Sequence, residues 1–331
     1  MRIAINGMGR IGRLLFRRLV GRPDIEVVAI NDIMPADNLV YLLKHDSIYG
    51  RFDMPMHIES GSLICGPHVV KIFSEPDPSR LPWADLQVDT ILECSGKFSS
   101  FAKASQHISA GARRVLLSTT GADDVPLMIY GLNEAALKDS TIIVSPGGCM
   151  TNCSVNVLQV LEEIGIESVQ INVLHSYTSR QELVDAPHPQ FRRGRAAAES
   201  IIPVEIDLHQ SLERMLPSLK GKIAAVSTRV PVSNGAMADF TVQMKEKVDR
   251  DQINELFRAA AKGYLKGVLD YSEEGLVSLD IKGDTHSCVI DGTLTSVVGN
   301  HLKVIAWFDN EFGFTSRMID WLGYWQPVKT M

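Results

Sequence analysis

The sequence predicts an α/β protein in two parts: a doubly wound parallel sheet of the Rossmann type, then an α+β part with a mixed, largely antiparallel sheet. The first part is predicted because short apolar strands alternate with helical patterns up to residue 148. The second is predicted because four longer runs of strand-forming residues follow, with few helical patterns between them. With 331 residues, 45% of them hydrophobic, the chain can bury two cores. We expect domains at 1–148 and 149–312, and a C-terminal helix in 313–331 that packs back on the first domain.

The composition is that of an ordinary globular protein. A net charge of −6 argues against a general nucleic-acid or anionic-membrane partner. The chain opens directly on a strand and contains no apolar run long enough to span a bilayer, so we expect a cytoplasmic protein. Its five cysteines are odd in number and scattered, which makes a disulfide framework improbable.

A glycine motif links the first strand to the first helix. Arg2–Ile5 is an apolar strand, and Arg13–Val20 has helical spacing of apolar residues. Glycines between such elements permit a tight turn and a close backbone approach, while the helix N-terminus receives a pyrophosphate. We therefore expect a dinucleotide to bind here, at Gly7, Gly9, Arg10, Ile11 and Gly12.

An acidic residue ends the next strand. The strand Glu26–Ile30 is followed by Asn31 and Asp32, and Asp32 lies 20 residues after Gly12. An acidic side chain there can bind both ribose hydroxyls and would repel a 2′-phosphate, which favours NAD over NADP. The alternative is an Asp that only caps a turn.

The alternation of strands and helices continues through the first part. We expect a helix at Phe101–Ala110 and strands at Ile91–Cys94, Arg114–Leu117 and Met128–Tyr130. Ligands in such sheets lie at the carboxyl ends of strands. The small polar residues that follow two of these strands are therefore expected to border the cofactor: Ser95, Gly96, Ser118 and Thr119.

A candidate nucleophile, Cys149, lies at a strand–turn–helix junction. The strand is Thr141–Val144, the turn is Pro146–Gly148, and Cys149 falls in the first turn of the helix. Unpaired N–H groups there favour a thiolate, and a neighbouring His would lower the thiol pKa further. The alternative is a buried structural cysteine. Cys153 lies one turn on; we interpret it as a packed helix residue rather than part of a metal or redox pair, and expect no metal.

The second part supplies a candidate base. Its expected strands are Ser168–Leu174, Ala224–Val232, Ala238–Lys245 and Val304–Phe308. Between the first two lies the polar segment Ser176–Ser200, and a loop that long is usually functional. His175 stands at its head. A thiol nucleophile needs a base, which favours a catalytic His175 over a purely structural one.

Taken together, these motifs resemble the glyceraldehyde-3-phosphate dehydrogenase family, in order and over nearly the full length. Some segments look more like its erythrose-4-phosphate dehydrogenase branch, among them Gly50–Phe52, Val184–Ala186 and His188-Pro189. The segments that carry the family resemblance are Asn6–Arg13, Asn31-Asp32, Cys149–Cys153, His175, Asp185, Arg193–Ala197, Ser200–Pro203, Arg229–Pro231 and Trp307–Gly313.

The resemblance implies a mechanism and a homotetramer. Cys149 would attack the aldehyde of a phosphorylated aldose, His175 would act as base, hydride would pass to NAD, and a thioester would remain on Cys149. Asn310 matches the residue that holds the nicotinamide carboxamide, although a turn Asn is the alternative. The substrate phosphate would be bound by Thr178, Arg180 and Arg229; Arg180 replaces a Thr and could instead face solvent.

One site departs from the family pattern. Where phosphorylating members hold inorganic phosphate with Ser, Thr and a Thr-Gly pair, this chain has Gly148, Met150, Ile206 and Asp207, with Glu205 alongside. Three hydroxyls are missing and two carboxylates are present, so we expect water rather than phosphate to release the thioester. The erythrose-4-phosphate branch hydrolyses its thioester but usually keeps the Ser and Thr beside the Cys, so the substitutions fit neither subgroup.

Three alternatives remain open. The chain could be a phosphorylating glyceraldehyde-3-phosphate dehydrogenase, or an NAD-binding regulatory protein with an altered site. It could also be another two-domain aldehyde dehydrogenase with a Cys nucleophile, such as a semialdehyde dehydrogenase, although the ordered motifs speak against this. Whether the aldose is glyceraldehyde 3-phosphate or erythrose 4-phosphate is left open.

Overall fold

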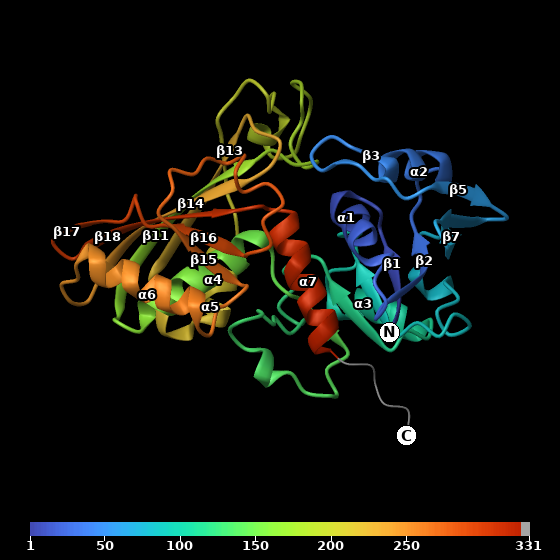
Figure 1. Ribbon diagram of the computed structural model, residues 1–331, viewed down its shortest axis with the longest axis horizontal. Coiled ribbons are helices and arrows are strands. Elements are labelled where there is room, and N and C mark those ends of the chain that lie inside the picture. The colour runs from blue at the N-terminus through green and yellow to red at the C-terminus, as the bar shows by residue number, and fades with distance from the viewer. Residues whose placement is uncertain (326–331) are drawn as a thin grey trace. The chain divides into compact units, whose positions relative to one another are not determined.

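The computed structural model describes residues 1–325, which fold as two compact units (Figure 1). Unit 1 contains Met1–Met128, Asn133–Gly147 and the chain from Met318 onward. Unit 2 contains Ile129–Leu132 and Gly148–Arg317. Each unit is built on a sheet of its own.

The sheet of unit 1 has eight strands in the order β10-β9-β8-β1-β2-β7-β6-β5. All pairs from β10 to β7 are parallel, and β7, β6 and β5 form an antiparallel edge. The chain winds outward from β1 in both directions, which confirms the predicted doubly wound sheet. The strands are β1 (Arg2–Asn6), β2 (Glu26–Asn31), β5 (Met56–Glu59), β6 (Ser62–Cys65), β7 (His68–Phe73), β8 (Thr90–Glu93), β9 (Arg114–Leu117) and β10 (Ile143–Val144).

Helices complete unit 1 around this sheet. Leu15, Phe16 and Leu19 of α1 are fully buried, as the helical spacing predicts, and Trp83 lies in a core cluster with Ile91 of the sheet. The helical elements are α1 (Arg10–Leu19), α2 (Ala36–Lys44), α3 (Phe101–Ser109) and the 3-10 turns η1 (Pro78–Arg80) and η2 (Glu134–Ala136). A separate small ladder pairs β3 (His45–Asp46) with β4 (Gly50–Arg51).

One predicted strand is wrong. Met128–Tyr130 forms no strand; Leu127 makes an isolated bridge to Ser145, and the chain then turns. The apolar run is buried, which explains its strand-like pattern. Gly131, with φ of +90°, redirects the backbone before a ladder can extend.

The sheet of unit 2 is mixed and largely antiparallel, as predicted. Its order is β12-β13-β11-β14-β18-β16-β15, with β17 paired to β18. Only β11 with β13 and β15 with β16 run parallel among the described pairs. The strands are β11 (Ile166–Ser176), β12 (Ile202–Val204), β13 (Ile223–Val230), β14 (Ala236–Met244), β15 (Leu269–Ser272), β16 (Cys288–Asp291), β17 (Ser296–Val298) and β18 (His301–Phe308).

Helices α4, α5 and α6 lie together beside this sheet (Figure 1). Helix α4 is the most buried of them, because Val155, Leu158 and Leu161 pack in the core. The elements are α4 (Cys149–Glu162), α5 (Leu208–Met215), α6 (Arg250–Lys262), η3 (Phe191–Gly194) and η4 (Pro217–Leu219).

The C-terminal helix α7 (Phe312–Tyr324) begins in unit 2 and continues into unit 1. Just after it, the guanidinium of Arg114 donates to the carbonyl of Trp325 at 3.1 Å and lies 5.0 Å from the centroid of its ring. The last six residues of the predicted 313–331 segment lie outside the described residues. Nowhere in residues 1–325 does a helix combine the length and apolarity that a bilayer crossing requires.

Candidate active site

The glycine motif of unit 1 forms a cradle that fits a dinucleotide. Gly7 has φ of +93°, and a Cβ on it would lie 2.4 Å from the backbone N of Ser95. A Cβ on Gly12 would lie 2.0 Å from the carbonyl O of Gly7, whereas one on Gly9 would meet nothing within 4 Å. No side chain caps the N-terminus of α1 at Gly9, so its positive end is left for an anion such as a pyrophosphate.

Asp32 is joined to this cradle. Its Oδ2 accepts from the backbone N–H of Met8 at 2.5 Å, and its Oδ1 accepts from the N–H of Met34 at 2.9 Å. Asp32 therefore does cap its own turn, through Met34, but the bond from Met8 also fixes its carboxylate beside the glycine turn. Each oxygen keeps a second lone pair for a ribose hydroxyl.

The remaining predicted cofactor residues of unit 1 follow β8 and β9 at the same edge of the sheet. Both the N–H and the hydroxyl of Ser95 donate to Glu93, at 2.8 and 2.5 Å. Gly96 adopts φ of +70°. Ser118 donates its N–H to the carbonyl of Glu93 at 2.9 Å, and the carbonyl of Thr119 accepts from Ser145 at 2.5 Å.

The guanidinium of Arg10 is paired within unit 1. Asp46 binds its guanidinium through both oxygens, at 2.5 and 3.2 Å, and Tyr49 lies under it at 5.9 Å. Arg10 and Ile11 are the first residues of α1. If these residues bind an anion, the backbone of this first turn would supply the contact, because the guanidinium is already paired with Asp46.

The predicted nucleophile and base meet in unit 2. Helix α4 begins at Cys149, and His175 is the penultimate residue of β11. The Sγ of Cys149 lies 3.6 Å from Nε2 of His175. Nδ1 of His175 lies 2.7 Å from the carbonyl of Ser176, an arrangement in which Nδ1–H donates. Nε2 is then the unprotonated nitrogen that faces the thiol.

The predicted net lowering of the Cys149 pKa is wrong, because burial outweighs the helix position. Burial raises the pKa of the thiol to about 11, although Arg229 and the N–H of Met150 act in the opposite direction. Burial, then the charge of Arg229, lowers the pKa of His175 to about 3. The two groups therefore gain charge only together, when one proton passes from Sγ to Nε2. Charges 3.6 Å apart attract by about 4–5 kcal/mol at an effective dielectric near 20, which offsets part of the burial cost.

Arg229 lies beside this pair. It is the register partner of His175 across the parallel β11–β13 ladder, and it is 7% exposed. Its Nη1 donates to the carbonyl of Ser176 at 3.4 Å, and its Nε is buried without a partner. Burial lowers its pKa to about 10, and the charges of Arg193 and Arg180 add to that effect. Within residues 1–325, no ion pair joins Arg229 or Arg193 to a carboxylate.

The loop after β11 holds these basic residues together. Gln181 donates its Nε2 to the carbonyls of Arg193 and Arg195, at 3.1 and 2.7 Å, which ties the turn at Thr178–Arg180 to η3. The Oγ1 of Thr178 accepts from the N–H of the exposed Arg180 at 3.4 Å. Arg193 was not predicted as a site residue, yet its Nη1 is buried without a partner. The sequence signal that could have identified Arg193 is the pair of adjacent arginines, Arg192 and Arg193, in a polar loop.

Asn310 is held by its oxygen. Oδ1 accepts from the N–H of Gly235 at 2.9 Å and from the hydroxyl of Ser176 at 3.1 Å, and Asn234 approaches it at 3.5 Å. The turn interpretation is thus correct locally, but the orientation leaves Nδ2 as the donor for a ligand. The side chain is 8% exposed.

The altered inorganic-phosphate positions carry no hydroxyl donor. Gly148 is the N-cap of α4 and Asp207 that of α5, and neither helix receives a side-chain cap. Glu205 and Asp207 are exposed. The charges that act most on Cys149 are those of Arg229 and Asp309. Solvent therefore screens much of the repulsion that the two carboxylates could exert on an anion.

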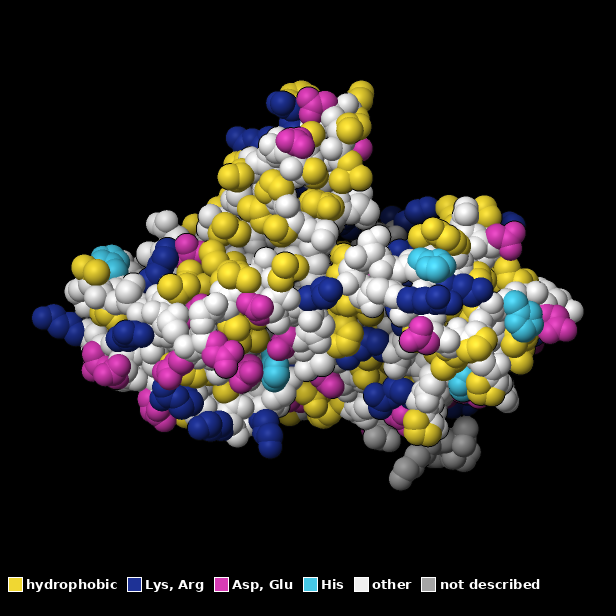
Figure 2. All heavy atoms as spheres, turned by 45° about the horizontal axis from the view of Figure 1, so that its top comes forward, with side chains coloured by type: hydrophobic (Ala, Val, Ile, Leu, Met, Phe, Trp, Pro, Cys, Tyr) yellow, Lys and Arg dark blue, Asp and Glu magenta, His cyan; other side chains and the backbone are white. Residues whose placement is uncertain are grey.

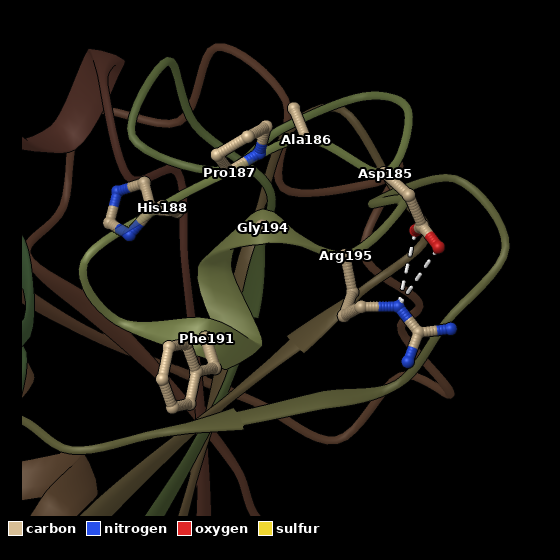
Figure 3. Close-up of a pocket in the computed structure, with 7 residues that line it drawn as sticks. All are labelled: Asp185, Ala186, Pro187, His188, Phe191, Gly194 and Arg195. Carbon is tan, nitrogen blue, oxygen red and sulfur yellow. Dashed lines mark hydrogen bonds and ion pairs between the residues drawn. The ribbon is translucent and has the colours of Figure 1, made fainter.

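A hollow of about 450 Å³ lies within the loop after β11 (Figure 3). In it, both oxygens of Asp185 lie 3.2 Å from Nε of Arg195, while the ring of Phe191 is 90% exposed. None of the predicted catalytic residues lines it, so it is a feature of the loop and not of the catalytic centre. The lining residues are Asp185, Ala186, Pro187, His188, Phe191, Gly194 and Arg195.

Comparison with known proteins gives a consistent result along the whole chain. Residues 1–101 match the family model described as "Glyceraldehyde 3-phosphate dehydrogenase, NAD binding domain". Residues 148–310 match the model described as "Glyceraldehyde 3-phosphate dehydrogenase, C-terminal domain". The first contains the glycine motif and Asp32, and the second contains Cys149 and His175.

Curated relatives are similar over almost their full lengths. The chain is 42% identical to glyceraldehyde-3-phosphate dehydrogenase 2 of Bacillus subtilis, over 97% of this chain and 95% of the relative. It is 40% identical to glyceraldehyde-3-phosphate dehydrogenase 1 of Streptomyces avermitilis, over 97% of each chain. It is 38% identical to the glyceraldehyde-3-phosphate dehydrogenase of Geobacillus stearothermophilus, over 98% of each.

Proposed function

The chain belongs to the glyceraldehyde-3-phosphate dehydrogenase family of NAD-dependent aldehyde oxidoreductases, and we propose that it oxidises a phosphorylated aldose and releases the acid by hydrolysis. The observation that carries this proposal is the Cys149–His175 pair, 3.6 Å apart, with the buried Arg229 beside it. Segments of the chain that resemble the erythrose-4-phosphate branch favour that four-carbon aldose over glyceraldehyde 3-phosphate.

The first step forms a bond between Sγ of Cys149 and the aldehyde carbon. As the bond forms, the thiol proton passes to Nε2 of His175, whose tautomer is fixed by Ser176. The N–H of Cys149 and the imidazolium then stabilise the developing oxyanion, which takes up the proton.

The second step leaves a thioester on Cys149. Bound NAD supplies the hydride acceptor. His175 removes the hydroxyl proton as the hydride departs, and Nδ2 of Asn310 would hold the carboxamide that sets the ring face. His175 then releases the hydroxyl proton to solvent. Water attacks the thioester carbon while the neutral His175 takes a proton from it, and His175 returns that proton to the Cys149 sulfur, which leaves as the thiol. The products are the acid, NADH and a proton.

The substrate phosphate is assigned to Arg229, Arg193 and Arg180, which we call the basic cluster. Nε of Arg229 and Nη1 of Arg193 are buried donors without partners, and a guanidinium matches a phosphate with two parallel hydrogen bonds. Thr178 and Arg180 lie on the turn that Gln181 ties to Arg193, and they are assigned to the same site.

Hydrolysis is favoured because the donors for an attacking phosphate are replaced. Gly148, Met150 and Ile206 stand where the phosphorylating enzymes have hydroxyls. An anion that leaves water needs hydrogen bonds in return, and each one missing costs about 1–3 kcal/mol. An attacking water molecule is neutral and does not need this set of hydrogen-bond donors.

The deciding experiment measures NADH formation from erythrose 4-phosphate and glyceraldehyde 3-phosphate, with and without inorganic phosphate. Turnover that is indifferent to phosphate supports hydrolysis, and the faster aldose is the substrate. Strict phosphate dependence would instead identify a phosphorylating enzyme. If neither aldose is turned over, stoichiometric acylation of Cys149 distinguishes a slow enzyme from an NAD-binding regulatory protein, which should show none.

We also propose a homotetramer in the cytoplasm. The loop after β11 exposes large apolar side chains, among them Val184, which is 73% exposed, and Phe191, which is 90% exposed. Ile201, just after this loop, is 72% exposed. Figure 2 shows hydrophobic side chains, in yellow, gathered on the part of unit 2 that carries this loop. Such a surface is typical of a contact between subunits. Sedimentation equilibrium tests the assembly: a monomer at micromolar concentration would contradict it.

The cysteines support the proposed cytoplasmic location. The five free thiols fit a reducing compartment.

A further inference from the structure

A buried carboxylate, Glu93, lies behind the cofactor loops of unit 1 and takes no part in the chemistry described above. It is the last residue of β8 and is 2% exposed. Its Oε1 accepts from the N–H of Ser95 at 2.8 Å and from the Ser95 hydroxyl at 2.5 Å. Its Oε2 accepts from Nδ2 of Asn6 at 2.5 Å and lies 2.9 Å from Nε2 of His107. A carboxylate offers about four acceptor positions, so Glu93 is saturated.

His107 on α3 is fully buried, and its second nitrogen shows which one carries the proton. The indole N–H of Trp83 donates to Nδ1 at 3.0 Å. Nδ1 therefore has no proton, and Nε2–H is the donor to Glu93. The ring of Phe98 packs edge-on against the imidazole, with centroids 5.9 Å apart. His107 thus presents one fixed donor, and the buried carboxylate is stabilised by hydrogen bonds from neutral groups.

The side-chain partners of Glu93 connect three of the loops that carry predicted cofactor residues. Asn6 precedes Gly7, and its Oδ1 accepts from Nδ2 of Asn31 at 2.7 Å. Asn31 in turn precedes Asp32, and Ser95 precedes Gly96. One carboxylate therefore connects the loops that follow β1, β2 and β8, the three that carry the predicted cofactor residues of the glycine motif, the ribose site and the β8 turn.

The same network extends to a fourth loop. Nδ2 of Asn31 donates to the carbonyl of Glu75 at 2.9 Å, and the N–H of Glu75 donates to Oδ1 of Asn31 at 2.9 Å. The parallel ladders end at Asn6, Asn31 and Glu93. Just beyond these residues two backbone bonds continue between the strands, from the N–H of Gly7 to the carbonyl of Asn31 at 2.8 Å and from the N–H of Cys94 to the carbonyl of Asn6 at 2.7 Å. The side-chain bonds add to these two bonds in setting the spacing of the loops.

We propose that Glu93, held by His107, is a positioning residue for NAD. It acts through Asn6 and Ser95, which set the distances between the glycine turn, the ribose carboxylate of Asp32 and the turn at Gly96. NAD affinity depends on this spacing, whereas aldose affinity, which rests on side chains of unit 2, does not.

The test is Glu93→Gln, which keeps the shape but replaces an acceptor with an NH₂ group. The amide can be placed in two orientations. In one the NH₂ group faces the donor Ser95, and in the other it faces the donors Asn6 and His107, so a hydrogen bond is lost in both. The Kd for NAD, measured by calorimetry, is expected to rise about 10- to 100-fold. KM for NAD follows it, while KM for the aldose changes less than about twofold.

Asp291 provides the matched control in unit 2. It is a carboxylate of equal burial, 1% exposed, at the end of β16. It accepts from the hydroxyl of Thr293 at 2.5 Å and from the indole N–H of Trp307 at 3.2 Å. Asp291→Asn is expected to lower Tm to a similar extent but to leave the Kd for NAD unchanged. A merely structural role for Glu93 would make the two variants behave alike.

Trp83→Phe decides the matter if Glu93→Gln does not fold. It keeps a large buried ring and removes the N–H that fixes His107, so the Kd for NAD is expected to rise about three- to tenfold. A Kd within about twofold of wild type in the folded variant would overturn the proposal. An equal rise in Asp291→Asn would also overturn it.

Discussion

The cofactor loops of unit 1 and the basic cluster of unit 2 satisfy their polar groups in opposite ways. Glu93 has a protein donor at every acceptor position, and its partners connect the loops after β1, β2 and β8. Arg229 and Arg193 instead keep buried N–H groups that have no partner. The first site is organised by the chain alone. We expect an anionic substrate to supply the missing acceptors of the second, and its binding should then stabilise unit 2 by linkage.

The largest test of this difference is His175→Asn, which should disable unit 2 and spare unit 1. Turnover is expected to fall about 10³-fold, because the thiol loses its base. At neutral pH, alkylation of Cys149 should become slow and then rise about tenfold per pH unit toward its pKa of about 11, since burial raises that pKa. NAD affinity should remain at the wild-type value. Alkylation as fast as in the wild type at pH 7 would contradict the assigned role of His175.

Arg229→Leu should separate recognition of the phosphate from the chemistry. The kcat/KM for a phosphorylated aldose is expected to fall about 100-fold, while that for the unphosphorylated aldehyde stays within about threefold. Thermal unfolding without ligand should occur at a higher temperature, because the substitution removes a buried charge whose pKa burial lowers to about 10. Added phosphate should stabilise the wild type but not the variant.

Arg258→Leu is the control for this substitution. Arg258 pairs with Glu255 and Glu273 on the surface of unit 2, where solvent screens an ion pair and leaves it little effect on stability. Its kinetics should match the wild type. Equal losses for both aldehydes in Arg229→Leu would show that Arg229 supports the fold of the site rather than the phosphate.

Asp32→Asn should weaken unit 1 alone. The Kd for NAD is expected to rise about tenfold, because a charged acceptor for the ribose is lost. The preference for NAD over NADP should narrow, since the repulsion of a 2′-phosphate is removed. Asp37→Asn, at an exposed position in the first turn of α2, is the control. An unchanged NAD/NADP ratio would mean that Asp32 only caps its turn.

The smallest expected effect comes from Gly148→Ser combined with Met150→Thr, which returns two hydroxyls to the start of α4. Added phosphate should then increase NADH formation about two- to fivefold, whereas the wild type should not respond. A Ser in place of the Gly at the N-cap should also stabilise α4, by about 0.3 kcal/mol. A phosphate-dependent wild type would contradict hydrolysis directly.

Local sequence patterns were sufficient where one short segment defines the feature. The glycine turn followed from Gly7 and Gly12, because no larger residue fits there. Both sheets followed from the alternation of elements in the first part and its absence in the second. The pairing of Cys149 with His175 could be proposed because their chemistry requires each other.

Features that depend on distant partners could not be predicted. In the sequence, Glu93 is indistinguishable from an ordinary strand residue. Its proposed role depends on hydrogen bonds with Asn6, 87 positions away, and with His107 on a helix. Likewise, the helix position of Cys149 indicated a low pKa, but the burial that raises it is set by the whole of unit 2. The buried run at Met128–Tyr130 was mistaken for a strand because burial, and not pairing, produces its apolar pattern.

His175 and Arg229 face one another across a single parallel ladder, as register partners on neighbouring strands. Adjacent strands in a sheet keep a spacing of about 4.8 Å. If Arg229 binds the substrate phosphate, the ladder sets the distance between that phosphate and the base His175, and this distance cannot increase without breaking the sheet. A longer or shorter substrate must be accommodated by the loop that carries Thr178 and Arg180. Divergence in substrate length among such enzymes should then appear as changes in that loop while the two strands stay constant.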